Sequence, residues 1–143
     1  MKITIITVGK PHLSFAKEGI DEYIKRIGAF AQVSLFPIKE NKDTESKITK
    51  LVAGSVCILL DETGKLFSTQ ELADAFESYK NKGENISLVI GGPDGHSDSI
   101  RSLSDASWAL SPLTFPHDIA TMLTTEAVYR ALSLSAGHPY HRA

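Results

Sequence analysis

The stretch Ile86-Ser87-Leu88-Val89-Ile90 runs directly into Gly91-Gly92-Pro93-Asp94-Gly95. The first half is short and almost entirely apolar, which favours a strand that is buried on both faces. The glycines and the proline of the second half force a loop. A buried strand that ends in such a loop is typical of a parallel sheet whose faces are covered by helices.

Four further short runs on either side of this stretch also predict strands. Each is mostly apolar, and each is bounded by glycine, proline or polar turn residues. Pro37 is expected to end the second of these strands, and a turn over Asp61–Gly64 is expected to close the third. The four predicted strands are Ile3–Val8, Val33–Phe36, Val56–Leu60 and Ser107–Leu110.

Apolar residues recur at helical spacing between the predicted strands. Phe15, Ile20 and Ile27 belong to one such apolar face, and Ser68-Thr69-Gln70-Glu71 is a capping box that begins another helix. The predicted helices cover residues 15–27, 40–52, 68–82, 97–104 and 117–136. Strands that alternate with helices predict an α/β fold with a mostly parallel sheet and helices on both faces, formed by residues 1–143 as one domain.

Composition is that of a globular protein. The 143 residues are 42% hydrophobic and 22% charged, with a formal net charge of −2. Residues 1–52 carry a net charge of +3, which is compatible with a basic binding face or with a solvated helix surface. Neither the short apolar run after Met1 nor any later stretch is long enough for a signal peptide or a membrane span. The single Cys57 lies in an apolar run and suits a reducing compartment, so we expect a cytoplasmic protein with a buried thiol.

Three loops that follow predicted strands have unusual sequences. In open α/β sheets ligands bind beyond the carboxyl ends of the strands, where these loops lie. Glycine lets a ligand approach the backbone, and apolar side chains suit a flat ring. The loops therefore suggest a cofactor with an aromatic base and few charges, although ordinary tight turns would have similar sequences. The three loops are Leu60–Gly64, Ile90–Gly95 and Leu110–Pro116.

Other ligand sites are disfavoured. The first predicted strand is followed by Gly9-Lys10-Pro11-His12, which is neither a dinucleotide-binding glycine motif nor a phosphate loop. The five histidines lack the spacing of a zinc site, so no metal is expected. His117 either begins the last helix as its N-cap or binds a ligand. Arg130 stands four residues after Glu126, as in a surface ion pair, but it is also placed to bind a phosphate.

Several motifs, in order along nearly the whole chain, resemble the RlmH family of ribosomal RNA large-subunit methyltransferases, which modify pseudouridine at N3. The resemblance is carried by Val8-Gly9-Lys10, Glu22–Arg26, Leu60–Lys65, Ile90–Gly95, Trp108–His117, Tyr129-Arg130-Ala131 and His138–Arg142. Two positions depart from the family pattern. Thr121 stands where an arginine is usual, and Ala127 stands where glutamine is frequent.

The resemblance implies an S-adenosylmethionine-dependent methyltransferase of SPOUT type, in which the chain near the cofactor forms a C-terminal trefoil knot. It also implies a homodimer and 23S ribosomal RNA in the ribosome as substrate. We expect the last helix to contribute apolar residues such as Met122 to the dimer interface. The family's cofactor contacts fall on Leu60, Gly91, Leu110, Ser111, Pro112, Leu113, Thr114 and Phe115.

The C-terminal tail is the candidate source of catalytic groups. Tyr140, His141 and Arg142 place a phenol, an imidazole and a guanidinium side by side, and Pro139 restrains the segment. These groups suit the removal of a proton from a weakly acidic imide, and one subunit's tail is expected to complete the site of the other. Two alternatives remain at this stage. One is an RNA-binding homologue that has lost catalysis, and the other is a non-enzymatic nucleotide-binding α/β module.

Overall fold

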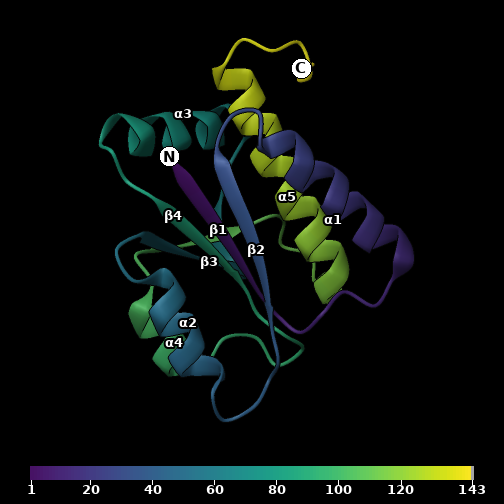
Figure 1. Ribbon diagram of the computed structural model, residues 1–143, viewed down its shortest axis with the longest axis vertical. Coiled ribbons are helices and arrows are strands. Elements are labelled where there is room, and N and C mark those ends of the chain that lie inside the picture. Colours follow the sequence, from purple (N-terminus) through teal and green to yellow (C-terminus); the bar gives the residue numbers. More distant parts are fainter. Residues whose placement is uncertain (143) are drawn as a thin grey trace.

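The computed structural model describes residues 1–142 and contains one five-stranded sheet, with the strands in the order β2-β1-β4-β3-β5 (Figure 1). All four neighbouring pairs are parallel, which confirms the predicted fold class and makes the sheet entirely parallel. The strands are β1 (Lys2–Val8), β2 (Gln32–Ile38), β3 (Val56–Leu66), β4 (Ile86–Ile90) and β5 (Ala106–Ala109).

Helices cover both faces of the sheet, as predicted. The first, third and fifth helices lie on one face, and the second and fourth lie on the other (Figure 1). The capping box is present, because the Ser68 hydroxyl accepts from the Glu71 amide while the Glu71 carboxylate accepts from the Ser68 amide. The helices are α1 (Ser14–Ile27), α2 (Thr44–Val52), α3 (Thr69–Asn81), α4 (Asp98–Leu103) and α5 (His117–Ser135).

Alternate residues of the buried strands supply two hydrophobic clusters. Ile3 and Ile5 of β1 face the cluster under α1, α3 and α5, whereas Ile6 and Val8 face the cluster under α2 and α4. Cys57 belongs to the second cluster and is 2% exposed, as expected of a small buried apolar residue. Burial raises the pKa of its thiol to about 11. Within residues 1–142, none of the helices has the length and apolar content that a membrane crossing requires.

The second strand continues through Pro37, although we expected it to end there. The strand β2 lies at the edge of the sheet and pairs only with β1, so a residue without an N–H is tolerated on its open side. Phe15 also differs from expectation. It is 57% exposed at the start of α1 rather than part of that helix's buried face.

The third strand is longer than predicted. It does not end at Leu60, because both Leu60 and Lys65 pair with Trp108 of β5 and the residues between them bulge from the ladder. The predicted turn over residues 61–64 is therefore a bulge within β3. A Cβ atom at Gly64 would lie 2.7 Å from the carbonyl carbon of Ser107, so the two chain segments approach at a distance that only glycine allows.

Candidate functional site

The three unusual loops converge on one cavity at the carboxyl edge of the sheet. The first is the bulge within β3, and the other two follow β4 and β5. These three strands are neighbours in the parallel sheet, so the bulge and the two loops lie side by side. The cavity between them has a volume of about 700 Å³, which is within the usual range for small-molecule sites. The prediction that these loops form a common site is thus supported by their placement.

Most of the expected cofactor-binding residues line this cavity. Seven of the eight do so: Leu60, Gly91, Leu110, Ser111, Leu113, Thr114 and Phe115. Pro112, the eighth, lies in the same loop but is not part of the lining. Leu113 is 68% exposed at the cavity rim, where an apolar side chain can cover a ligand.

Side-chain bonds tie the loops to one another. The Thr114 hydroxyl donates to the carboxylate of Glu62 at 2.6 Å, which joins the third loop to the first. His96 Nε2 lies 2.9 Å from the carbonyl oxygen of Leu60, which joins the second loop to the first. Arg101 of α4 pairs with Asp61 at 2.6 Å. The cavity walls are therefore held before any ligand binds, which reduces the ordering cost of binding.

Acidic groups outnumber basic ones around the cavity. Asp61, Glu62 and Asp94 line it, whereas Arg101 is the only Lys or Arg in its lining among residues 1–142. Burial alone would raise the pKa of Asp61, but hydrogen bonds from Thr63 and the Arg101 guanidinium hold it below the ordinary value. Asp61 is therefore charged at neutral pH, and Arg101 balances that charge. The carboxylates of Glu62 and Asp94 remain, so the cavity favours a ligand with positive charge.

A side chain at Gly91 would crowd its own loop, which the sequence did not reveal. We expected a side chain there to occupy space needed by the ligand. Instead, a Cβ atom at this position would lie 3.1 Å from the backbone of Gly95 and 3.2 Å from the His96 ring. A side chain at residue 91 would first disturb its own loop, so Gly91→Leu does not test ligand contact alone.

The α5 side of the cavity is fixed by two adjacent residues. His117 is the first residue of α5, and Pro116, not His117, occupies the N-cap position, so the expected N-cap role of His117 is wrong. Its Nε2 atom lies 3.2 Å from the Val8 carbonyl oxygen, and its buried Nδ1 atom has no hydrogen-bond partner within residues 1–142. Asp118 accepts from the amides of His12 and Leu13 at 2.6 and 2.7 Å, which joins α5 to the loop after β1.

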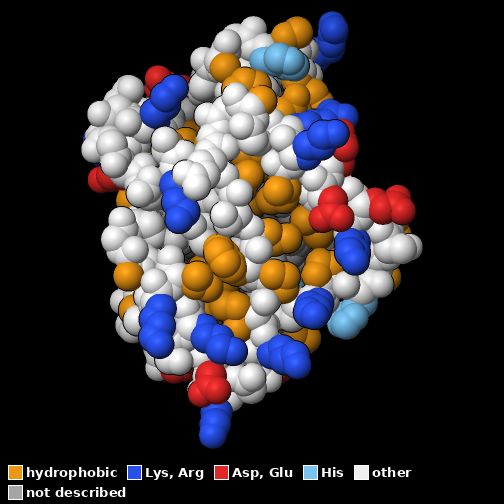
Figure 2. All heavy atoms as spheres, in the orientation of Figure 1, with side chains coloured by type: hydrophobic (Ala, Val, Ile, Leu, Met, Phe, Trp, Pro, Cys, Tyr) orange, Lys and Arg blue, Asp and Glu red, His pale blue; other side chains and the backbone are white. Residues whose placement is uncertain are grey.

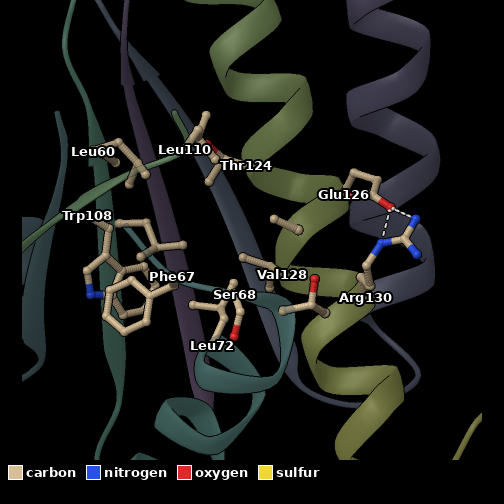
Figure 3. Close-up of a pocket in the computed structure, with 14 residues that line it drawn as sticks. Leu60, Phe67, Ser68, Leu72, Trp108, Leu110, Thr124, Glu126, Val128 and Arg130 are labelled. Atoms are coloured by element: carbon tan, nitrogen blue, oxygen red, sulfur yellow. Dashed lines mark hydrogen bonds and ion pairs between the residues drawn. The ribbon is translucent and has the colours of Figure 1, made fainter. Parts of the chain in front are cut away.

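A smaller cavity of about 170 Å³ adjoins the first between the sheet, α3 and α5. It shares Leu60 and Leu110 with the larger cavity. In Figure 3, Trp108 and Phe67 form its apolar wall, whereas Glu126 and Arg130 point away from that wall and are joined by the dashed ion pair.

The C-terminal tail is anchored to α5 and α1 and does not line the larger cavity. The Tyr140 hydroxyl donates to Glu126 at 3.1 Å and lies 3.4 Å from the Tyr23 hydroxyl. Arg130 forms the expected ion pair with Glu126, and its Nη1 atom lies 3.3 Å from Nδ1 of His141. Neither Tyr140, His141 nor Arg142 belongs to the lining of the larger cavity. Ala143 lies outside the described residues.

Two further residues singled out from the sequence have internal partners. Thr121 is fully buried, and its hydroxyl donates to the His117 carbonyl at 2.9 Å. The sulfur of Met122 lies against Gly19 of α1 in the same chain, where a Cβ atom at Gly19 would meet it at 2.6 Å. The argument for a dimer therefore does not rest on Met122.

The chain matches known proteins along its full length. A family model described as "Predicted SPOUT methyltransferase" matches residues 1–141. A protein of Deinococcus radiodurans named "Ribosomal RNA large subunit methyltransferase H" is 41% identical over 145 residues, covering 99% of both chains. A protein of the same name from Acinetobacter baylyi is 37% identical over 159 residues and covers 100% of both.

Solved structures share the fold at low sequence identity. A probable methylase family protein from Haemophilus influenzae is 11% identical with a TM-score of 0.60, covering 99% of this chain and 70% of that one. The SpoU methyltransferase AviRb from Streptomyces viridochromogenes, solved with the cofactor AdoMet, is 13% identical with a TM-score of 0.50. The match covers 96% of this chain and 61% of that one.

Proposed function

Because the chain belongs to the SPOUT methyltransferase family, we propose that it methylates N3 of a pseudouridine in 23S ribosomal RNA, with S-adenosylmethionine as the methyl donor. The observation that carries the proposal is the cavity of about 700 Å³, formed by three loops in a chain that matches ribosomal RNA methyltransferases from end to end. The ribosome is the substrate we infer, and the cytoplasm is therefore the place of action.

The cavity suits S-adenosylmethionine in shape and in charge. Leu110 and Phe115 offer apolar surface to an adenine ring, and the loop backbones offer polar groups. The excess of carboxylates favours the positively charged sulfonium of the cofactor, because Glu62 and Asp94 remain after Asp61 is paired with Arg101. The residues we assign to cofactor binding are Leu60, Gly91, Leu110, Ser111, Pro112, Leu113, Thr114 and Phe115.

When bound, S-adenosylmethionine supplies an activated methyl group, so the protein's task is to position the RNA and to prepare its nucleophile. N3 of pseudouridine carries a proton in a weakly acidic imide, which leaves little of the reactive anion at neutral pH. A base that removes this proton, or donors that stabilise the resulting anion, would lower the barrier. We assign the base to His141 and the donors to Tyr140 and Arg142.

A homodimer would bring these tail residues to a cofactor cavity. In its own chain the tail is anchored beside residues 126–130 of α5, whereas the part of α5 that lines the larger cavity ends at Ala120. A second subunit whose tail lies over the cavity would supply the missing catalytic groups. Sedimentation should therefore give a dimer at micromolar concentration, and a monomer would contradict the shared site.

Basic side chains of the N-terminal third offer a surface for RNA. Figure 2 shows Lys and Arg side chains gathered over the lower part of the face on which α1, β2 and α2 lie. The dimer would join two such surfaces, and a folded ribosomal target also permits recognition by shape. The basic residues we assign to RNA contact are Lys10, Lys17, Lys25, Arg26, Arg130 and Arg142.

We also infer that the chain is knotted beside the cavity, as expected of its family. This inference rests on the family, because the close approach of Gly64 to the backbone of Ser107 and Trp108 is that of two neighbouring parallel strands and not a crossing of the chain. Knots are rare in proteins, so sequence patterning alone does not predict one.

Methyl incorporation into ribosomes is the decisive test. Purified protein is incubated with labelled S-adenosylmethionine and ribosomes that lack the modification, and label should enter 23S RNA at one pseudouridine. Calorimetric titration with S-adenosylmethionine is run in parallel. Cofactor binding without transfer would indicate a homologue that has lost catalysis, and no cofactor binding would indicate the non-enzymatic module.

A further inference from the structure

His96 occupies a distinctive place between two of the cofactor loops. The residues Gly92–Gly95 form a tight turn in which the Gly95 amide donates to the Gly92 carbonyl at 3.0 Å, and Gly95 has φ +72°. This turn brings the chain back on itself, so that the His96 ring lies close to Gly91. The ring therefore lies directly over the point where β4 ends.

From there His96 reaches across to β3. Its Nε2 atom lies 2.9 Å from the carbonyl oxygen of Leu60, the residue that pairs with Ile90 at the end of β4. Leu60 is also where β3 begins to bulge from its partner strand. Since a carbonyl only accepts hydrogen bonds, Nε2 of His96 must carry the hydrogen. One side chain thus supplies a donor to the backbone at the base of the cavity.

A second bond from the same segment reinforces this link. Arg101 of α4 pairs with Asp61, the residue after Leu60. Two consecutive residues of the first loop are therefore held from the segment that follows β4, one by its backbone and one by its side chain.

We propose that His96 is a positioning residue for the methyl donor, which acts by fixing the Leu60 backbone relative to Gly91 through its Nε2–H bond. The inference rests on the proposed use of S-adenosylmethionine by this cavity. His96 fixes the distance between the start of the β3 bulge at Leu60 and the end of β4, so less ordering of the cavity is needed when the cofactor binds. The role belongs to the donor atom and not to the ring as such.

Two substitutions separate the donor from the ring. His96→Gln retains an amide donor but loses the ring, and His96→Phe retains a ring over Gly91 but loses the donor. We expect His96→Phe to weaken S-adenosylmethionine affinity by roughly three- to tenfold, the range for loss of one hydrogen bond. His96→Gln should remain within about twofold of the intact protein. His12→Leu is the matched control, because its side chain is exposed outside the cavity lining.

The readouts are calorimetric affinity and the melting temperature with and without S-adenosylmethionine. The proposal expects His96→Phe to lower the cofactor-free melting temperature no more than the loss of one hydrogen bond elsewhere does, as in Tyr140→Phe. The rise of its melting temperature on adding cofactor should be smaller than that of the intact protein. His96→Leu takes the place of the phenylalanine variant if that variant does not fold. Affinity unchanged by loss of the donor overturns the proposal, as does equal weakening in His96→Gln. Failure of the intact protein to bind the cofactor would instead overturn the proposed function.

Discussion

The hydroxyl of Tyr140 donates a hydrogen bond to the carboxylate of Glu126 at 3.1 Å, across 14 residues of chain. The same carboxylate oxygen accepts from Nε of Arg130 at 2.9 Å, and the Arg130 guanidinium lies 4.8 Å from the centre of the Tyr140 ring. Tyr140 also packs against Tyr129, with ring centroids 4.6 Å apart. The tail is therefore held on α5 by both polar and aromatic contacts.

Removal of the Tyr140 hydroxyl should destabilise the folded protein modestly. Tyr140→Phe keeps the ring and its packing but loses the bond to Glu126, so the free energy of unfolding should fall by about 1 kcal/mol. Urea unfolding of the variant and the intact protein measures this change. Tyr79→Phe on α3 serves as the control for loss of a hydroxyl elsewhere. Equal unfolding midpoints for Tyr140→Phe and the intact protein would show that the bond contributes nothing.

The same phenol should make the protein sensitive to alkali. Burial, together with the hydrogen bonds to Tyr23 and Glu126, raises the pKa of Tyr140 above its ordinary value of 10.0. Its stabilising effect is therefore complete below pH 10 and is lost as the pH rises further, because the unfolded chain ionises first. Between pH 10 and 12 the intact protein should lose more stability than Tyr140→Phe does. Cys57 is present in both proteins, so its own raised pKa cancels from the comparison.

Gly64 should be among the least replaceable positions outside the core. A Cβ atom there would lie 2.7 to 2.8 Å from the backbone of Ser107 and Trp108, and neither segment has a flexible side-chain end that can move aside. We expect Gly64→Ala to lower the free energy of unfolding by roughly 2 kcal/mol or more, in the range for overpacking. Gly83→Ala is an informative control, since its Cβ would meet nothing within 4 Å and only its φ of +69° opposes substitution. Equal losses in the two variants would argue against the close approach.

The fold was predictable because its signals are local. The strand at Ile86–Ile90 and the capping box at Ser68 and Glu71 depend on neighbouring residues, and both are present in the structure. The continuation of β3 to Leu66 was missed, because it depends on pairing with Trp108, which is distant in sequence. The end of β2 was wrongly predicted at Pro37 for a similar reason, since only the order of the strands reveals that β2 is an edge strand, where proline is tolerated.

The sequence predicted which loops form the site, but it did not predict which side chains within the site contact one another. Glycine and proline in the predicted loops, which are the bulge of β3 and the loops after β4 and β5, indicated where a ligand would bind, and the cavity lies there. The roles of His96 and Arg101 left no signal in the sequence, because their partners Leu60 and Asp61 are brought near only by the parallel sheet. The anchoring of Tyr140 was hidden in the same way.

Asp118 should make the folded protein less stable in acid, because it holds the segment that leads into α1. Burial alone would raise its pKa, but hydrogen bonds from the Leu13 and His12 amides lower it below the ordinary value of 3.8. Its contribution is therefore complete above that value and is lost as the pH falls further. Asp118→Ala should cost about 1–3 kcal/mol at neutral pH, because two partly buried amides lose their acceptor. Urea unfolding from pH 7 to pH 3 should show a smaller loss on acidification in the variant; an identical loss would exclude Asp118 as a source of acid sensitivity.

Deletion of residues 138–143 should abolish methyl transfer while leaving S-adenosylmethionine affinity nearly unchanged, because none of Tyr140, His141 and Arg142 lines the cavity. Methyl incorporation into unmodified ribosomes and calorimetric titration of the cofactor measure the two properties on the same preparation. If the tail acts across a dimer, mixing the truncated chain with the Gly91→Leu chain should restore part of the activity. Each partner then supplies what the other lacks: an undisturbed cavity from one, and an intact tail from the other. Full activity after truncation would remove Tyr140, His141 and Arg142 from the mechanism. Loss of cofactor binding together with activity would show that the contacts between the tail and α5 support the fold of the site itself.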